Sequence, residues 1–284
     1  MDLLKRIAAI HDISGVGKCS LTVALPIISA AGVECSVLPT AVLSTHTGGF
    51  TGFTFRDLTE DMASLAARWK AENIHFDAFY SGYLGSLSQI DIVHDIFEMF
   101  REPDMLIVVD PVMADNGKLY SLFTQEHVGG MAKLCGHADV IVPNRTEAAF
   151  MLGKEYRDGP MTENEVSEIL KALAGLGAKQ IVLTGVYFGE NDLGAACYDT
   201  KTGCIDCVMG ERIGGQYHGS GDVFASFLTG ALMRGKGLAD AARVAVDFTC
   251  RAICLTVADG TEPRMGLRFE SVLADYGKLM GTEN

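Results

Sequence analysis

Gly219-Ser220-Gly221-Asp222 is the segment whose residue types and spacing best fit a chemical step. It opens the apolar run 223–228, which predicts a helix. The glycines let the backbone turn its N–H groups toward one point, and the helix dipole adds roughly half a positive charge there, so a phosphoryl group in transfer fits this position. Asp222 could accept a proton from an attacking hydroxyl. The alternative is that Asp222 only caps the helix and the glycines only form the turn.

Carboxylates and an amide follow two other apolar runs. Asp110 comes after residues 105–109, and Asn144 and Glu147 come after residues 140–142. Oxygen side chains of this kind hold Mg²⁺, directly or through water, while the metal bridges nucleotide phosphates. In the alternative interpretation Asn144 is a helix N-cap and Glu147 lies in the first helical turn, roles that are compatible with metal binding.

Short apolar runs alternate with amphipathic segments along the chain, the pattern of βαβ units and a parallel sheet. Thr162 and Glu165 form a capping box before a helix at 163–176, which Gly177 ends. Further helices are expected at 20–31 and, as a pair separated by residues 234–237, within 222–257. The expected parallel strands are residues 4–10, 34–40, 78–81, 105–109, 140–142 and 180–184, and an antiparallel hairpin at the sheet edge comprises 193–199 and 204–209. No linker or repeat interrupts the chain, so residues 1–284 are predicted to form one domain.

Polar and glycine-rich segments follow all six expected strands, at residues 11–17, 44–49, 81–86, 110–113, 143–147 and 184–185. Ligands of parallel sheets bind beyond the carboxyl ends of the strands, so these segments are predicted to meet in one site. Residues 15–20 look like part of a phosphate-binding P-loop. Asp12 and Cys19 replace the glycine and the Ser or Thr that a P-loop requires, so that interpretation is rejected.

The composition excludes several classes of partner. The 284 residues carry a net charge of −13, which argues against a broad nucleic-acid or anionic-membrane surface. The apolar run at the start of the chain is too short for a signal peptide, and no other apolar run is long enough to span a membrane. A cytoplasmic protein is therefore predicted. Eight scattered cysteines indicate reduced side chains. Cys204 and Cys207 have CxxC spacing but no second pair or nearby histidine to complete a zinc site.

With these motifs identified, the chain resembles the pyridoxal/pyridoxamine kinases of the ribokinase-like superfamily, in order over nearly its whole length. The matching stretches are Ser44-Thr-His-Thr47, Ser81-Gly-Tyr-Leu-Gly-Ser86, Asp110-Pro-Val-Met113, Pro143-Asn-x-x-Glu147 and Gly219-Ser-Gly-Asp222. The resemblance implies a three-layer α/β/α sandwich with a mostly parallel central sheet and a small or reduced edge lid. It further implies ATP and Mg²⁺ as cofactors, transfer of the γ-phosphoryl to the 5′-hydroxymethyl group of a B6 vitamer (pyridoxamine, pyridoxal or pyridoxine), and a homodimer.

The resemblance also assigns roles to residues. Asp222 would be the base, and Gly219, Ser220 and Gly221 would form the anion hole. Asp110, Asn144 and Glu147 would serve the metal and the phosphates, with Asp110 and Glu147 on the metal side. Thr184, with Gly185, would reach the nucleotide phosphates, and the vitamer ring would lie near Asp12, His46, Thr47, Tyr83 and Asp222. From position alone, adenine is expected around residues 210–216 and the helix at 246–253.

One departure leaves the choice of substrate open. Pyridoxal kinases carry a serine where this chain has Asp12, and Asp12-Ile-Ser-Gly15 is similar to the opening of hydroxymethylpyrimidine kinases of thiamine synthesis. A carboxylate there could bind an aminopyrimidine or the amino group of pyridoxamine. Those pyrimidine kinases have a Gly-Ser-Gly-Cys pattern, with cysteine at the base position, where this chain has Asp222. A sugar or nucleoside kinase of the superfamily and a non-catalytic PLP-binding protein also stay open as interpretations.

Overall fold

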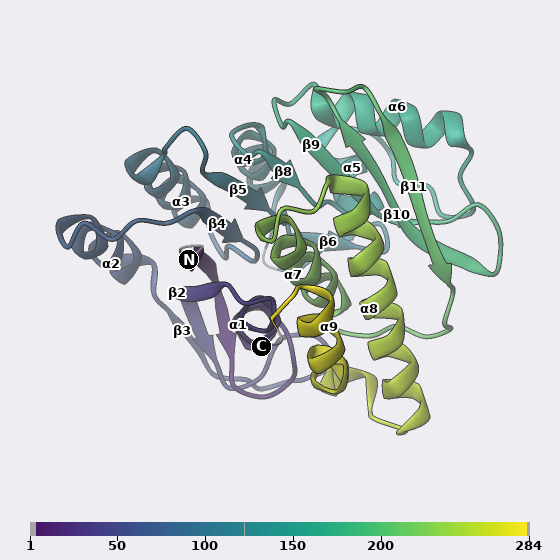
Figure 1. The fold of residues 1–284 in the computed structure, drawn as a ribbon, viewed down its shortest axis with the longest axis horizontal. Helices are drawn as coiled ribbons and strands as arrows, with labels where there is room; N and C mark the ends of the chain where they lie inside the picture. Colours follow the sequence, from purple (N-terminus) through teal and green to yellow (C-terminus); the bar gives the residue numbers. More distant parts are fainter. Residues whose placement is uncertain (1–3, 122, 283–284) are drawn as a thin grey trace.

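The computed structural model describes residues 4–121 and 123–282, and its described part is built on a nine-stranded sheet (Figure 1). The six strands from β9 to β2 pair in parallel, whereas β10 is antiparallel to both of its neighbours and β3 is antiparallel to β2. The spatial order is β11 (Ile205–Glu211), β10 (Asp192–Asp199), β9 (Gln180–Val186), β8 (Val140–Ile141), β5 (Leu106–Val109), β4 (Ala78–Ser81), β1 (Arg6–Ser14), β2 (Glu34–Leu43) and β3 (Phe55–Asp57).

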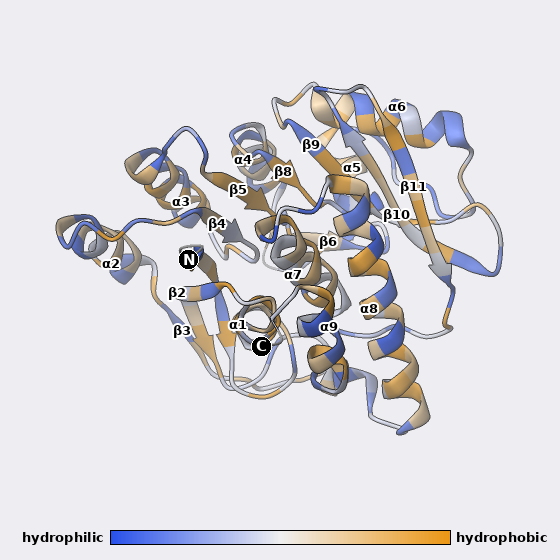
Figure 2. Cartoon of the chain, in the orientation of Figure 1, coloured by the Kyte–Doolittle hydropathy of each residue, from blue (hydrophilic) through white to orange (hydrophobic). Residues whose placement is uncertain are grey.

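Helices cover both faces of this sheet and bury two apolar cores. Side chains alternate along each strand, so Ile7 and Ala9 of β1 enter one core, and Ala8 and Ile10 enter the other. Figure 2 shows the apolar strands between helices whose outer faces are more polar. One layer contains α1 (Leu21–Ala30), α7 (Ser220–Met233), α8 (Leu238–Ala258) and α9 (Leu273–Leu279); the other contains α2 (Thr59–Ala71), α3 (Leu87–Phe100), α4 (Gln125–Gly136), α5 (Arg145–Met151) and α6 (Glu163–Ala174). The predicted three-layer sandwich is confirmed.

The structure extends the first predicted strand. β1 runs to Ser14, so His11 and Asp12 lie inside the strand and not after it. The polar sequence looks like a strand end, and the pairing of β1 with β4 does stop at Ile10. Pairing with β2 continues to Ser14, which keeps the backbone of β1 in the ladder. The β1–β2 register shifts between His11 and Ile13, and irregularities of this kind re-aim side chains next to functional sites.

The other predicted elements agree closely with the structure. The edge hairpin is β10–β11, the pair of C-terminal helices is α7 and α8, and Pro26 lies inside α1. The capping box of Thr162 and Glu165 is present in α6. That helix ends at Ala174 with Gly175 as its C-cap, two residues before the predicted Gly177.

The resemblance implies a small or reduced edge lid, and a short hairpin adjoins the main sheet after β5. β6 (Ala114–Asp115) and β7 (Lys118–Leu119) form a separate two-stranded hairpin, and the Gly117 N–H donates to Thr146 Oγ1 of α5 at 3.0 Å. Two single 3₁₀ turns, η1 (Pro263–Met265) and η2 (Phe269–Val272), precede α9.

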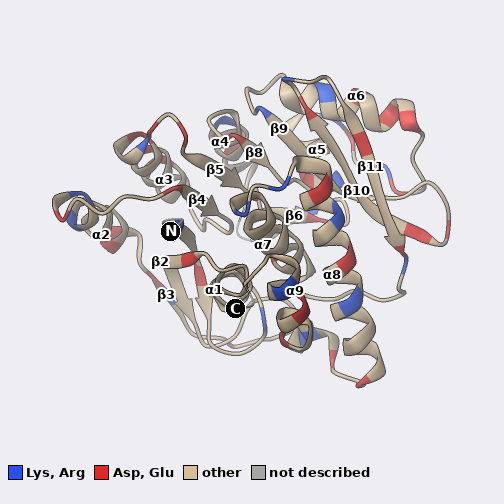
Figure 3. Cartoon of the chain, viewed as in Figure 1, with Lys and Arg blue, Asp and Glu red and all other residues tan. Residues whose placement is uncertain are grey.

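In the described residues, no helix has the length and apolarity to cross a membrane. Acidic and basic residues are both found along α6 and along α8 (Figure 3).

Candidate active site

The site begins where the chain order of the sheet reverses, between β1 and β4. Asp12 lies at this point and is almost fully buried. Its carboxylate accepts hydrogen bonds from Ser20 Oγ at 2.6 Å and Ser14 Oγ at 3.0 Å. Burial raises the pKa of Asp12, and the two hydroxyl groups act against that shift. Ligands of doubly wound sheets bind at such a reversal, so Asp12 is placed to meet a substrate.

The N-terminus of α7 approaches Asp12 from the same side. Its N-cap, Gly219, has φ = 75°, and a Cβ on it would overlap the Lys18 carbonyl oxygen, so only glycine fits. The Val223 N–H donates to the Gly219 carbonyl at 3.0 Å, which is the first turn of the helix. Helix geometry leaves the preceding N–H groups without intrahelical acceptors. A Cβ on Gly221 would meet no atom within 4 Å, so open space lies beside these donors.

Asp222 lies in the first turn of α7, beside this space. The pKa of its carboxyl is raised to about 7, mainly by burial and then by the negative charge of Asp12. A carboxylate of this kind is a stronger base than an exposed aspartate and still ionises near neutral pH. The geometry therefore suits general-base chemistry next to an anion-binding helix terminus.

Asp110 and Glu147 form the acidic side of the site. Glu147 is buried, and its carboxylate accepts the N–H of Met113 and of Asn144, each at 2.9 Å. Asp110 follows β5, and its N–H donates to the Ser81 carbonyl at 2.9 Å. Burial raises the pKa of Asp110 well above its usual range, and the charges of Glu147 and Asp222 act in the same direction. Glu147 and Asp222 therefore lie near enough to Asp110 to disfavour its ionised form.

A divalent cation fits this arrangement, because it would offset the negative charge that Asp110 and Glu147 concentrate. Among the described residues, one oxygen of Glu147, Oε2, accepts a single hydrogen bond, from the Asn144 N–H, and it retains acceptor capacity toward a metal or its water. The Asn144 side chain is used differently. It caps α5 by accepting from Thr146 and Glu147, and its Nδ2 donates to the Ala114 carbonyl at 2.7 Å. The N-cap alternative for Asn144 is therefore confirmed.

Thr184 and Gly185 lie at the end of β9, next to Asn144. The Thr184 N–H donates to the Pro143 carbonyl at 2.9 Å, and Thr184 and Asn144 form an isolated parallel bridge. The β9–β10 register shifts at Gly185, whose φ is 75°, so glycine is the extra residue of a bulge. The two predicted phosphate-side residues thus adjoin the acidic cluster.

Of the residues predicted around a substrate ring, His46 and Tyr83 lie close to Asp12. His46 uses both ring nitrogens within the protein: Nε2 lies 2.6 Å from the Arg264 carbonyl, and Nδ1 accepts from the Gly48 N–H at 3.0 Å. It can therefore shape a pocket wall but has no ring nitrogen left for a ligand. Burial, then the charges of Asp12 and Asp57, raise the pKa of Tyr83 to about 12.

Thr47 is not tied to the rest of the site. It is exposed in the loop after β2, and no hydrogen bond links it to another residue in the described part of the chain. Its predicted contact with a substrate ring remains a prediction.

Three further aromatic residues, not singled out from the sequence, lie at the site. Tyr80 is buried beneath the site. Its burial raises the pKa of its hydroxyl, and the charges of Asp110 and Asp222 act in the same direction. The pKa of Tyr120 is raised by burial and by the surrounding carboxylates, Glu147 first. His218 precedes Gly219, and its ring lies 5.4 Å from that of His46. Tyr80 and His218 directly adjoin predicted motifs, a position that could have indicated them; Tyr120 has no such signal.

The two segments expected near adenine face one another across an open hollow of about 580 Å³. Gly210 and Glu211 of β11 line one side, and α8 and α9 line the other with Asp247, Phe248, Cys250, Arg251, Asp275, Lys278 and Leu279. Adenine binding there remains a prediction.

The three-layer fold, with carboxylates at strand ends and a glycine-rich helix N-terminus, defines a kinase of the ribokinase-like superfamily. The family model for phosphomethylpyrimidine kinase matches residues 24–265. The chain belongs to this family, which places it with the pyridoxal kinases of that superfamily.

Several known proteins resemble the chain over most of its length. A protein of Bacteroides thetaiotaomicron VPI-5482, named for phosphomethylpyrimidine kinase and crystallised with pyridoxal, is 40% identical with a TM-score of 0.92; the match covers 96% of each chain. Pyridoxal kinase from Lactobacillus plantarum is 33% identical with a TM-score of 0.90, covering 99% of this chain and 100% of that one. The pyridoxine/pyridoxal/pyridoxamine kinase of Bordetella avium is 26% identical over 265 residues, 89% of this chain and 86% of that protein.

Proposed function

We propose that this chain transfers the γ-phosphoryl group of ATP to the 5′-hydroxymethyl group of a B6 vitamer, giving the 5′-phosphate. The observation that carries the proposal is Asp222, a carboxylate with a pKa raised to about 7 at the open N-terminus of α7. The pyridoxal held by the Bacteroides relative supports this substrate class.

In the proposed reaction, Asp222 accepts the proton of the substrate hydroxyl as its oxygen attacks the γ-phosphorus. The bond from that phosphorus to the bridging oxygen of ADP breaks, and ADP leaves with the bonding electrons. The amides at the start of α7 stabilise the charge on the transferring oxygens. Positioning and electrostatics supply most of the rate in phosphoryl transfer, so the fixed backbone at Gly219 matters as much as the base.

Asp110 and Glu147 are the residues proposed to hold Mg²⁺, with Glu147 acting through Oε2 or through water. When bound, the metal would neutralise charge on the β- and γ-phosphates. Thr184 and Gly185 are proposed to contact the nucleotide phosphates, because they adjoin Asn144 at the end of β9. Asp12, His46, Thr47 and Tyr83 are proposed to surround the vitamer ring.

A hydroxymethylpyrimidine kinase is the second candidate, and Asp12 is the observation that favours it. The hydroxyl groups of Ser14 and Ser20 donate to the Asp12 carboxylate, which stabilises its ionised form. An ionised carboxylate there could accept from an aminopyrimidine, or pair with the amino group of pyridoxamine. The matching family model is itself named for a pyrimidine kinase.

The remaining proposals concern the protein as a whole: one domain over residues 1–284, a homodimer in solution, and a cytoplasmic location. A net charge of −13 supports small-molecule partners in place of nucleic acid or a membrane surface. Gel filtration with light scattering tests the dimer directly.

The deciding experiment is Mg²⁺-dependent ADP release with pyridoxamine, pyridoxal, pyridoxine and hydroxymethylpyrimidine measured side by side. Turnover on a B6 vitamer well above the pyrimidine supports the proposal. Preference for the pyrimidine overturns it in favour of the second candidate. If no substrate is turned over, and pyridoxal 5′-phosphate but not ATP raises the melting temperature, the chain is a non-catalytic PLP-binding protein.

A further inference from the structure

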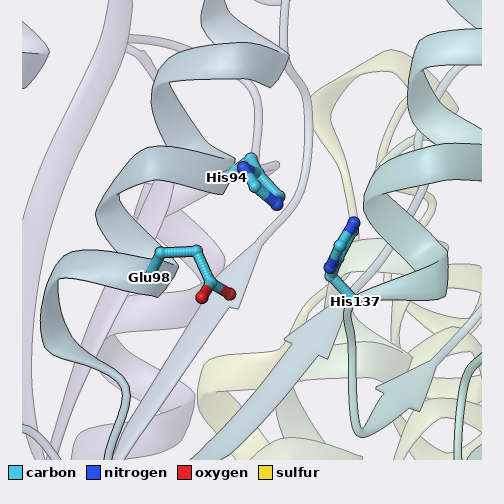
Figure 4. A group of neighbouring side chains, drawn as sticks. All are labelled: His94, Glu98 and His137. Carbon is cyan, nitrogen blue, oxygen red and sulfur yellow. The ribbon is translucent and has the colours of Figure 1, made fainter.

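His94, Glu98 and His137 form a cluster of metal-ligating side chains that the kinase chemistry does not use. His94 and Glu98 lie one turn apart on α3, and residues with this spacing share one helix face. His137 is the C-cap of the neighbouring helix α4. Figure 4 shows the three side chains turned toward the same gap between the two helices.

The cluster lies away from the candidate active site. Asp139, two residues after His137, donates its N–H to Ile107 near the start of β5, whereas Asp110 follows the end of that strand. α3 begins after β4 at the carboxyl edge, and Glu98 is in its last turn. The cluster is therefore at the amino edge of the parallel sheet, opposite the proposed phosphoryl-transfer site.

The geometry is close to that of a metal site. One ligand atom from each residue can be chosen so that all lie within 4.8 Å of one another. The two imidazole rings meet edge to face, with centroids 4.4 Å apart. His94 Nε2 is buried and has no hydrogen-bond partner among the described residues. A buried polar nitrogen left without a partner calls for an explanation, and a ligand is one.

We propose that His94, Glu98 and His137 bind a divalent transition-metal ion, for which Zn²⁺ is the best match, and that the ion ties α3 to α4. Two imidazoles and one carboxylate are a set that zinc accepts, with water in the fourth position. Ligand atoms at about 2.0–2.2 Å from a tetrahedral zinc lie roughly 3.4 Å apart. Binding of the ion would require ring rotation and movement of the half-exposed Glu98 side chain to close the remaining distance.

Arg101 competes with the ion for one oxygen of Glu98, and it also holds the segments that carry Glu98 and His137 together. Its Nε donates to Glu98 Oε1 at 2.9 Å, and its Nη2 donates to the His137 carbonyl at 3.2 Å. These bonds hold two ligand-bearing segments together, and they leave Glu98 Oε2 for a metal. Mg²⁺ prefers six oxygen ligands, so the ion required for phosphoryl transfer is not expected to bind here.

The test is calorimetric titration of chelator-treated full-length protein with Zn²⁺ and, separately, with Mg²⁺. The exposed thiols of Cys204 and Cys207 could also take up zinc, so all proteins carry Cys204→Ser and Cys207→Ser. We expect one equivalent of Zn²⁺ and a zinc-dependent rise in melting temperature. His137→Ala and, independently, Glu98→Gln are expected to weaken Zn²⁺ binding by at least about 10–100-fold and to remove that rise.

His75→Ala is the matched control, because His75 is also exposed and also lies beside a glutamate, Glu102. It is expected to leave both readouts unchanged. The proposal is overturned if His137→Ala binds Zn²⁺ as tightly as its parent, or if the control weakens binding equally. These readouts need no kinase activity, so they succeed or fail independently of the proposed function.

Discussion

Asp12 is the charged residue that most raises the pKa of Asp222, although the two carboxylates come from β1 and from α7, more than 200 positions apart in sequence. Asp12 is itself held by Ser14 and Ser20. Burial raises the pKa of Asp222 most, and the negative charge of Asp12 adds to that shift. The residue expected to contact substrate therefore also increases the basicity of the residue expected to take its proton. In the proposed reaction, substrate recognition and proton transfer would be coupled through this pair.

Replacing Asp12 with asparagine is expected to move the acid limb of the activity profile to lower pH. Asp222 must be ionised to act as base, so kcat/KM should rise through an apparent pKa near 7 in the natural protein. Removing the negative charge of Asp12 makes ionisation of Asp222 easier, which lowers that pKa. The measurement is kcat/KM against pH for both proteins with the preferred substrate. An unchanged acid limb would show that the two groups are not coupled.

Asp222→Asn is expected to lower kcat by about 10²–10⁴-fold while leaving the fold intact. The pKa of Asp222 is about 7 in the folded protein, against about 4 for an aspartate in an unfolded chain. Its protonated form therefore contributes stability that is fully present below about pH 4 and is lost as the pH rises through about 7. Asparagine does not titrate. The variant should therefore gain stability relative to the natural protein between pH 5 and pH 8.

Thermal melting at both pH values checks the second half of that prediction independently of activity. Near-normal turnover by Asp222→Asn would mean that another group is the base. A melting difference that does not grow with pH would mean that Asp222 is already ionised at pH 5.

The sequence predicted the parallel sheet, and where most of the candidate site residues lie on it, because both depend on local patterns. Alternating apolar runs placed Asp110, Asn144, Glu147 and Thr184 at the ends of parallel strands, and parallel strands bring such ends together. The continuation of β1 through Ser14 was missed because its polar residues are buried and it pairs there with β2, a strand distant in sequence. Local hydrophobicity carries no information about such coverage.

Tyr120 and the metal-ligand cluster show a second limit. Tyr120 lies in the loop after β7 and meets Glu147 only through the fold. His94 and Glu98 have helical spacing, but His137 completes the cluster from another helix. A single residue that reaches a site only through a tertiary contact has no neighbouring motif in the sequence, so no spacing pattern indicates its role. Cys204 and Cys207 are the reverse case: their CxxC spacing is visible in the sequence, but among the described residues no third metal-ligating side chain joins them in a cluster.

Substitution of two glycines of the same motif by alanine is expected to affect stability differently. Gly219→Ala forces a side chain into a left-handed conformation, which costs about 1–2 kcal/mol, and into the Lys18 carbonyl as well. We expect a fall in melting temperature of at least about 2–4 °C. Gly221→Ala adds its methyl group to open space and should leave the melting temperature near that of the natural protein.

The same Gly221→Ala methyl group would occupy the space where the transferring phosphoryl group is proposed to lie. Turnover is therefore expected to fall on the order of 10²-fold, as for a misplaced reacting group. Measuring melting and kcat for both variants separates structural from catalytic effects. Full activity in Gly221→Ala would place phosphoryl transfer elsewhere.

Asp110→Asn is expected to raise the Mg²⁺ concentration needed for half-maximal activity by roughly tenfold, because it removes one of the two carboxylates proposed to hold the metal. The pKa of Asp110 is raised by burial and by two neighbouring carboxylates, so its stability contribution is lost as pH rises above the value for an unfolded chain. Without Mg²⁺, the variant should therefore melt at a higher temperature than the natural protein at pH 8.

Chelation with EDTA should abolish turnover in both proteins, and excess Mg²⁺ should restore it at different concentrations. The exposed Asp104→Asn changes net charge equally and serves as the control, with no expected effect on the Mg²⁺ requirement. Equal Mg²⁺ requirements for Asp110→Asn and Asp104→Asn would remove Asp110 from the metal site. A lower melting temperature for Asp110→Asn at pH 8 would instead show that the buried carboxylate is stabilised by contacts other than a cation.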